Sequence, residues 1–208
     1  MNTSITGQLP LSQPFNPALP YFGNPNPVWL YNGTESVTSM PASVVDWVLV
    51  EARDAVNAAT ATAATSVGKK AGLLLSNGNI VGTNLQPISF PISISHSLFV
   101  VVYHRNHLAI MSSAGLAESG GVYSWDFTTA LGKAYNNGQK ALGSYFGMYG
   151  GDGDGNNQVL TQDKTGVWNI QAGKVGYLGS DYKLNGQVNN QDKDDIWYPN
   201  RNKVSPIP

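Results

Sequence analysis

The sequence predicts a mainly β protein, in which an antiparallel β-sandwich is followed by a smaller region of duplicated sequence. Three observations carry this prediction. Short runs of β-branched and aromatic residues recur between turn signals, helical periodicity is hard to find before residue 128, and two related segments occupy the last third. With 208 residues, 41% of them hydrophobic, the chain is long enough for one large domain or two small ones. We expect the β-sandwich in residues 1–143 and the duplicated region in residues 144–208.

The first elements are an extended N-terminal arm and a central strand. Residues 1–43 are rich in Pro, Asn, Ser and Gly, so at most two strands are expected there. The run "VVDWVLVEAR" from Val44 is apolar on both faces, which is typical of a strand in the middle of a sheet. The small-residue segment "AVNAATATAATSVGKK" from Ala55 leaves two alternatives open, a helical turn or a loop followed by a strand.

Clear turn signals divide the next part of the chain. In "GLLLSNGNIVG", Asn77 and Gly78 separate two apolar runs, which predicts a tight type I′ hairpin. The segment "PISFPISIS" from Pro87 alternates apolar with small polar residues and contains two prolines, so we expect an edge strand with one buried face. "SLFVVVYHRNHLAIMS" from Ser97 and "GVYSWDFT" from Gly121 complete a series of short strands at the spacing of a sandwich.

The last third contains an internal duplication. "DGDGNNQVLTQDK" begins at Asp152, and "DYKLNGQVNNQDK" begins 29 residues later at Asp181. Over seventeen aligned positions eight residues are identical, which indicates two copies of one unit. The identical pairs are Asp152/Asp181, Asn156/Asn185, Gln158/Gln187, Val159/Val188, Gln162/Gln191, Asp163/Asp192, Lys164/Lys193 and Trp168/Trp197.

The spacing in the first copy matches a twelve-residue calcium loop. Such a loop supplies side-chain oxygens at positions 1, 3 and 5, a backbone carbonyl at 7 and a carboxylate at 12, with a sharp turn at 6. Because three close carboxylates repel one another, we expect cation binding to be coupled to folding. Val159, at position 8, is expected to pair the two loops through a short β contact. The expected ligands are Asp152, Asp154, Asn156, the carbonyl of Gln158, and Asp163, with Asn157 at the turn.

The second copy departs from this pattern at position 3, which is Lys183. Two alternatives stay open: Lys183 points outward and a water fills the gap, or its ammonium takes the place of the cation. Both copies end in Asp where Glu is usual, so the following helix is expected to lie closer to the ion. The remaining expected ligands are Asp181, Asn185, the carbonyl of Gln187, and Asp192, with Gly186 at the turn.

Two features of the sequence resemble a known family. Residues 145–208 resemble a dockerin-type pair of calcium-binding repeats. The longer pattern "SVVDWVLVEARDA", "LLLSNGNIVG", "VVVYHRNHLAIMS", "YSWDFTTA" and "NGQVNNQDKDDIW" resembles a module at the C-termini of large secreted surface proteins of the Bacteroidota. The resemblance implies export, a non-catalytic role, and a longer precursor in which Met1 is an internal residue exposed by processing. The family usually has Asn where this chain has Lys183.

Composition excludes several classes of function. The formal net charge is −1, and the 12 Lys and Arg form no basic stripe, so no nucleic-acid partner is expected. Apolar runs are far shorter than the roughly 20 residues of a transmembrane helix, so no membrane insertion is expected. With no cysteine, neither a disulfide nor a thiolate metal site is possible. The first residues show neither a basic n-region nor an apolar h-region, so we expect that the chain is cytoplasmic or that its leader has been removed.

Enzymatic and glycan-binding roles have weaker signals. "HRNH" at His104–His107 could bind zinc, but residues three apart in a strand point to opposite faces, so a structural hydrogen-bonding role is expected. Of the five tryptophans, Trp29 and Trp125 remain as surface aromatics on which a sugar could stack. Trp47 falls in a core strand, and Trp168 and Trp197 recur with the duplication.

We therefore expect a non-enzymatic, calcium-stabilised subunit that is extracellular or lies at the cell surface. Its Pro-rich, polar ends need a partner to hold them, and an extended arm can add to a neighbouring copy. Such head-to-tail contacts produce a fibre or surface layer when they do not close. The alternative is a glycan- or protein-binding module of a larger secreted surface protein.

Overall fold

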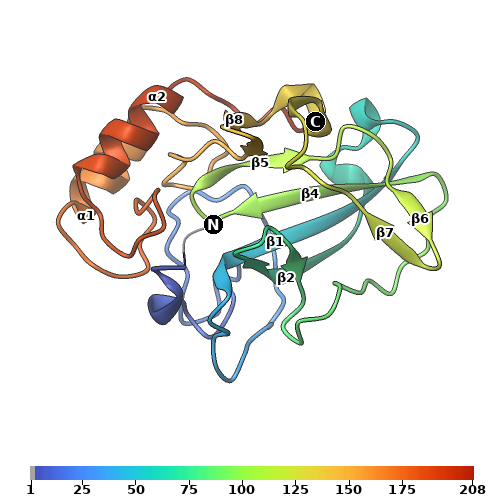
Figure 1. Cartoon of the computed structure of the whole chain (residues 1–208), viewed down its shortest axis with the longest axis horizontal. Helices are drawn as coiled ribbons and strands as arrows, with labels where there is room; N and C mark the ends of the chain where they lie inside the picture. The colour runs from blue at the N-terminus through green and yellow to red at the C-terminus, as the bar shows by residue number, and fades with distance from the viewer. Residues whose placement is uncertain (1–2) are drawn as a thin grey trace.

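The computed structural model describes residues 3–208 and shows a mainly β protein built on one antiparallel sheet (Figure 1). The sheet has five strands in the order β3-β2-β1-β4-β5. Figure 1 places the two C-terminal helical segments at one end of this sheet and the β6–β7 ribbon at the other. The strands are β1 (Val44–Ala55), β2 (Ser66–Leu75), β3 (Ile80–Val81), β4 (Ser97–His104) and β5 (His107–Met111).

Strand β1 is the centre of the sheet, as its sequence predicts. It pairs antiparallel with β2 on one side and with β4 on the other. Eleven of its twelve residues are buried, because both faces of the sheet are covered. On one face Trp47 and Leu49 join a large hydrophobic cluster, and on the other Val48 and Val50 join a smaller one.

The N-terminal arm covers the first face of the sheet. Its residues Ile5, Leu9, Phe15 and Trp29 belong to the same hydrophobic cluster as Trp47. The arm contains one short helical turn, η1 (Thr6–Gln8), and an isolated bridge between Ser12 and Ser36. The predicted antiparallel, mainly β fold is therefore confirmed. Where a sandwich would place a second large sheet, this Pro-rich arm packs through side chains.

Residues 87–95, here called the strap, cover the second face. Ile88 and Phe90 pack against the cluster that contains Val48. Every second residue from 88 to 94 is partly buried and the residues between are exposed, as the alternating sequence predicts. The predicted edge strand is nevertheless wrong: the strap forms no ladder, because Pro87 and Pro91 have no N–H to donate.

The predicted hairpin after β2 is confirmed, but its turn is not type I′. Gly78 has a φ of 94°, and its N–H donates to Leu75 O at 2.9 Å. Asn77 keeps a negative φ, so one left-handed residue is enough, as in hairpins that add a glycine bulge after a type I turn. The segment after Ala55, left open above, contains two helical turns, η2 (Ala58–Thr60) and η3 (Ala63–Thr65), before β2.

Smaller elements follow β5. Two ribbons, β6–β7 and β8–β9, are separate from the main sheet. The predicted boundary after residue 143 falls in the turn between β8 and β9, which are hydrogen-bonded to each other. Within residues 3–208, no helix has both the length and the apolarity to span a membrane. The elements are β6 (Ala117–Ser119), β7 (Val122–Ser124), η4 (Leu131–Lys133), η5 (Tyr135–Asn137), β8 (Lys140–Leu142) and β9 (Tyr145–Gly147).

The two sequence repeats form two equivalent helical segments. Residues 161–171 and 190–200 are helical, and their bounds differ by the same 29 residues as the sequences. Each segment has a π-helical middle, η6 (Asp163–Trp168) or η7 (Asp192–Trp197), and ends in a short α-helical turn, α1 (Asn169–Gln171) or α2 (Tyr198–Asn200).

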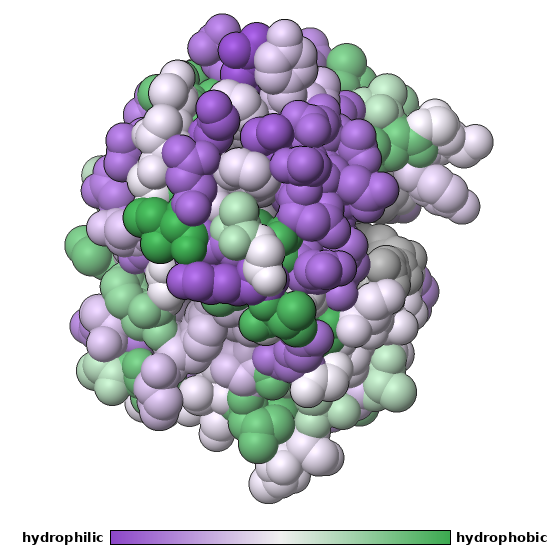
Figure 2. All heavy atoms as spheres, turned by 90° about the vertical axis from the view of Figure 1, so that its left-hand side faces the viewer, coloured by the Kyte–Doolittle hydropathy of each residue, from purple (hydrophilic) through white to green (hydrophobic). Residues whose placement is uncertain are grey.

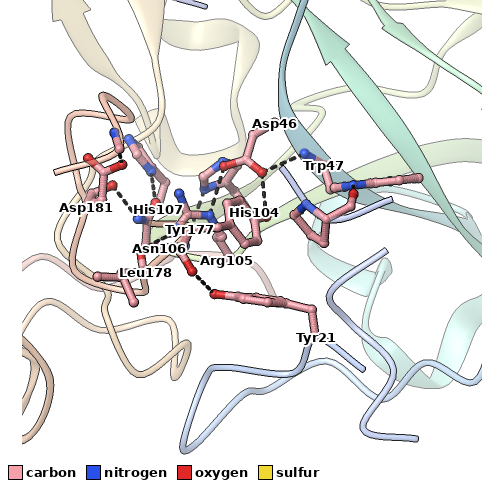
Figure 3. A network of polar contacts seen from close by, with 12 residues as sticks. Tyr21, Asp46, Trp47, His104, Arg105, Asn106, His107, Tyr177, Leu178 and Asp181 are labelled. Atoms are coloured by element: carbon pink, nitrogen blue, oxygen red, sulfur yellow. Dashed lines mark hydrogen bonds and ion pairs between the residues drawn. The ribbon is translucent and has the colours of Figure 1, made fainter. Parts of the chain in front are cut away.

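A buried polar network joins the sheet to the repeats (Figure 3). At its centre the Asp46 carboxylate, fully buried on β1, accepts from Arg105 Nε at 2.9 Å and from the Tyr177 hydroxyl at 2.5 Å. His104 Nε2 lies 3.2 Å from the same carboxylate. Burial alone would raise the pKa of the Asp46 carboxyl, but Arg105 and His104 hold it well below its usual range. The network therefore contains a buried ion pair whose two charges depend on each other.

Removing the Asp46 carboxylate should destabilise the whole protein. In Asp46→Ala, the Arg105 guanidinium stays buried without its counter-charge, which typically costs about 3–5 kcal/mol of unfolding free energy. Urea denaturation followed by tryptophan fluorescence measures this loss. Asp54→Ala removes a carboxylate from the same strand that accepts from Ser95 N–H and His96 N–H but neutralises no buried guanidinium, so this matched control should lose less. Equal losses in the two variants would contradict the role given to the network.

Candidate metal centre

Three carboxylates from the first repeat lie together in the interior. Asp152, Asp154 and Asp163 are at most 3% exposed, and ligand oxygens from the three lie within 4.8 Å of one another. Among the described residues, this is the group of three or more metal-ligating side chains close enough to share an ion. None of the three forms an ion pair with a residue in the range 3–208. The group can therefore bind a metal ion.

Backbone amides of the loop hold two of these carboxylates in place. Asp152 accepts from the N–H groups of Asn156 and Asn157, both at 2.9 Å. Asp163 accepts from Gly153 N–H and from Leu160 N–H, both at 2.7 Å. Asp163 lies in the first turn of its helical segment, so the start of the helix closes the loop. The carboxylates are thus oriented by the chain itself before any ion is considered.

The electrostatics of the triad favour a positive partner. Burial, with the nearby charge of Asp163, raises the pKa of the Asp152 carboxyl well above its usual range. Burial also raises the pKa of Asp154, and it raises that of Asp163 to about 6. Three carboxylates in this setting can ionise together only when a cation offsets their repulsion.

Other predicted ligands of this loop lie beside the triad. The Asn156 amide Oδ1 accepts from Gln158 N–H at 2.9 Å, and its Nδ2 donates to Asp154 Oδ2 at 3.0 Å. Asn157 has a φ of 63° and makes the sharp turn predicted at position 6. The structure therefore gives the first loop the backbone course that its sequence predicts.

The second loop repeats the hydrogen bonds of the first. Asp181 accepts from the N–H groups of Asn185 and Gly186 at 3.0 and 2.7 Å, as Asp152 does from its counterparts. Asp192 accepts from Asn189 N–H at 2.9 Å, as Asp163 does from Leu160. The Asn185 amide oxygen accepts from Gln187 N–H at 3.0 Å. The loop framework is therefore duplicated in three dimensions, not only in sequence.

Lys183 points away from the second loop. Its ammonium donates to Gln191 Oε1 at 3.0 Å and lies 3.5 Å from a carboxylate oxygen of Asp195, near the protein surface. Of the two alternatives left open by the sequence, the outward orientation holds, and the ammonium does not take the place of a cation. The second loop nevertheless has two carboxylates where the first has three.

The two repeats exchange contacts instead of pairing their loops directly. Gln158 of the first loop forms an isolated bridge with Val204, which follows the second helical segment, and Gln187 forms the equivalent bridge with Val175. The predicted β contact at Val159 is therefore wrong in its partner. Each loop pairs with the segment that leaves the other repeat's helix, because the two units lie in a reciprocal arrangement.

The reciprocal arrangement of the repeats also explains why both copies have a tryptophan at the same position. The Trp197 indole N–H donates to Leu160 O of the first loop at 3.0 Å, and the Trp168 indole N–H donates to Asn189 O of the second at 3.1 Å. Both carbonyls belong to position 9 of their loops. Each helix thus fixes the loop of the other repeat.

Asn157 connects the first loop to the main sheet, a role that sequence reasoning missed. Its side-chain Oδ1 accepts from Ala109 N–H on the edge strand β5 at 3.1 Å. Its backbone carbonyl accepts from Ser205 N–H in the C-terminal tail at 2.9 Å. The signal in the sequence is the departure from Gly at position 6, since Gly has no side chain with which to make this bond.

The histidines predicted to be structural are part of the buried network. His104 and His107 face each other across the two-residue turn of the β4–β5 hairpin, with ring centroids 4.7 Å apart. The expectation that they lie on opposite faces of one strand is therefore wrong, because the chain turns between them. Burial lowers the pKa of His107 well below its usual value, and Nδ1 of the ring lies 2.8 Å from Asn106 Oδ1.

The two predicted surface tryptophans differ from each other. Trp29 is only 3% exposed and packs edge-to-face on Phe15, so the prediction of a surface aromatic is wrong at this position. Trp125 is partly exposed; its indole N–H donates to Lys133 O, and the Lys133 ammonium lies 4.8 Å from its ring centre. Figure 2, which views the helical end, shows mostly hydrophilic residues with scattered hydrophobic ones.

Comparison of the chain with protein-family models, with curated proteins and with solved structures gives no match in any of the three.

Replacing Asn157 by Gly should separate metal binding from the contact with the sheet. Gly adopts a positive φ freely, so the loop keeps its shape and its cation affinity, whereas the bond to Ala109 N–H is lost. An unsatisfied buried donor costs about 1–3 kcal/mol of unfolding free energy. Chemical denaturation measures that loss, and calorimetric titration with a divalent cation should show an affinity within about threefold of the parent. A large loss of affinity would contradict this assignment.

The triad should also give the cation-free protein an unusual pH dependence. The pKa of Asp163 is about 6 in the folded protein, against 3.8 for an unperturbed carboxyl as in the unfolded chain. The folded form therefore binds more protons between these two pH values. In chelator, the unfolding free energy should therefore fall as pH rises from about 4 to about 7. A bound divalent cation keeps the carboxylates ionised, so with saturating cation stability should instead fall as pH decreases. Thermal melts across this range, with and without chelator, measure both slopes.

Proposed function

We propose that this protein is a non-enzymatic, calcium-stabilised structural or adhesive subunit that works outside the cell or at its surface and self-assembles into a fibre or layer. The observation that carries the proposal is the buried triad of Asp152, Asp154 and Asp163, which has no ion-pair partner in residues 3–208. A site of this kind at the junction of arm, sheet and tail stabilises the fold.

Calcium fits this donor set better than other common metals. All the candidate ligands are oxygens, which suits hard cations, and the loop has the twelve-residue length that places a carboxylate at position 12. The described group contains no His or Cys, the ligands that zinc prefers. The second loop, with Asp181 and Asp192 but Lys183 at position 3, is proposed as a weaker site.

Several observations support a structural role over a catalytic one. His104, His107 and Arg105, the residues most suited to catalysis, are committed to the buried network around Asp46. The arm covers a whole face of the sheet and is attached beside the first loop. The resemblance to secreted surface modules favours an extracellular location. We infer that the duplicated region is dockerin-like and that the sheet with its covering layers is a divergent sandwich.

A glycan- or protein-binding module is the second candidate function. Trp125 supports it, since this ring is partly exposed and lies in a T-shaped arrangement with Phe127 at 6.4 Å. A glycan array separates the two proposals. Signal that disappears in Trp125→Ala but persists in Trp29→Phe would favour the binding module.

Calcium should raise thermal stability through the first loop. In Asp163→Asn, we expect calcium affinity to fall more than about 100-fold, because loss of an outer-shell partner alone costs 10–100-fold. The increase in melting temperature that calcium gives the parent should then be absent at the same calcium concentration. The matched control is Asp194→Asn, an exposed carboxylate in the second helical segment that lies 3.3 Å from the Lys193 ammonium and is not among the proposed ligands. If EGTA leaves the melting temperature of the parent unchanged, the calcium proposal is wrong.

Self-assembly should be visible directly. Negative-stain electron microscopy and light scattering of the protein in millimolar calcium should show polymers that grow with protein concentration. A particle that stays monomeric across a hundredfold concentration range would contradict assembly while leaving the calcium site intact.

A further inference from the structure

The N-terminal arm is attached to the first calcium loop by its backbone. Asn26 N–H donates to Asp154 O and Val28 N–H donates to Gly155 O, both at 3.0 Å. The Asn24 side chain donates to Gly153 O at 3.1 Å and to Arg105 O at 2.5 Å. The carbonyls that receive the arm therefore belong to positions 2, 3 and 4 of the loop, next to the carboxylates of the triad.

A side-chain contact adds to these bonds. A Cβ atom at Gly155 would lie 2.7 Å from the Trp29 ring, so this glycine allows the ring to lie directly on the loop. The same ring packs at 5.2 Å from Phe15 and belongs to the cluster over the sheet. Trp29 thus touches both the loop and the core, and its position depends on the shape of the loop.

The segment between arm and sheet is suited to act as a hinge. Residues 38–43 are exposed or partly exposed, and the turn into β1 is closed by Val44 N–H donating to Pro41 O at 3.0 Å. Beyond the loop, the arm is held to the rest of the chain mainly by side chains, such as Trp47 Nε1 donating to Pro10 O at 2.9 Å. An exchange of arms breaks no ladder of the main sheet, and an incoming arm with the same sequence restores the contacts of the buried side chains over its first face.

We propose that the arm is exchanged between copies of this chain and that the ion in the first loop is its latch. This inference rests on the proposed calcium site and names the partner for self-assembly, a second copy whose arm occupies the same seat. The occupant follows from the structure, because the seat already holds an identical segment and its contacts are available to any copy's arm. With the ion bound, the loop carbonyls stay fixed and each arm stays where it is.

Loss of the ion should open the latch. Without the ion the three neighbouring carboxylates repel one another, the hydrogen bonds that Asp154 O and Gly155 O accept from the arm weaken, and the arm exchanges more readily with that of another copy. On return of calcium the seat closes on whichever arm is present. At high protein concentration many seats close on an arm from another copy, and open head-to-tail exchange gives a polymer.

The absence of cysteine makes a clean crosslinking test possible. Phe22 on the arm and Ile170 on the first helical segment line one shallow cavity, and both are exposed. We would mix a Phe22→Cys copy with an Ile170→Cys copy, treat the mixture with EGTA, restore calcium, and add a bis-maleimide of about 10 Å reach. A Phe22→Cys/Ile170→Cys double variant, crosslinked within one chain, verifies that the reach is sufficient.

The expected result is a crosslinked dimer of the mixed copies, at least tenfold more abundant after the EGTA step than when calcium is present throughout. The control partner is Val56→Cys, which is exposed just after β1. Asp46 marks the end of β1 that contacts the repeats, and Val56 lies ten residues, roughly 33 Å, further along the chain. This variant should therefore give no dimer. The proposal is overturned if the double variant crosslinks but the mixture gives no dimer, if Val56→Cys gives as much dimer, or if EGTA makes no difference. The calcium proposal fails separately, if EGTA does not lower the melting temperature.

Discussion

The fold of the C-terminal third depends on how three buried negative charges are tolerated. Asp152, Asp154 and Asp163 lie within 4.8 Å of one another in the protein interior, where water cannot screen them. The backbone amides of the loop solvate these carboxylates in part, yet the pKa of each is raised, which means that the amides alone are not enough. The interior of the loop therefore requires protons or a cation, and its geometry suits the cation.

The duplication makes the two repeats depend on each other. Each helix gives its indole hydrogen bond to the opposite loop, and each exit segment bridges to the opposite loop. A repeat on its own would leave these carbonyls and amides without partners, so the two units are expected to open together as one cooperative element. Through Asn157, which reaches both β5 and the tail, this element is also coupled to the sheet.

The sequence correctly predicts the features that depend on local patterns of residues. The central position of β1, the hairpin at Gly78 and the backbone course of the first loop follow from the periodicity of side chains and from turn chemistry, which act over a few residues. Contacts between residues far apart in the sequence could not be predicted from local patterns. The buried pair of Asp46 and Arg105 joins residues 59 apart, and no local pattern links them. Similarly, Glu51 and Arg53 form a buried ion pair at 3.0 Å on a strand that otherwise reads as apolar.

The strap limits how a strand of another chain can pair with this side of the molecule. Its outward side presents small polar side chains, and its two prolines interrupt the row of amides that an approaching strand would need. The strap thereby covers a hydrophobic face of the sheet and cannot itself act as a template for strand pairing. Addition of a neighbouring strand along the strap is therefore disfavoured.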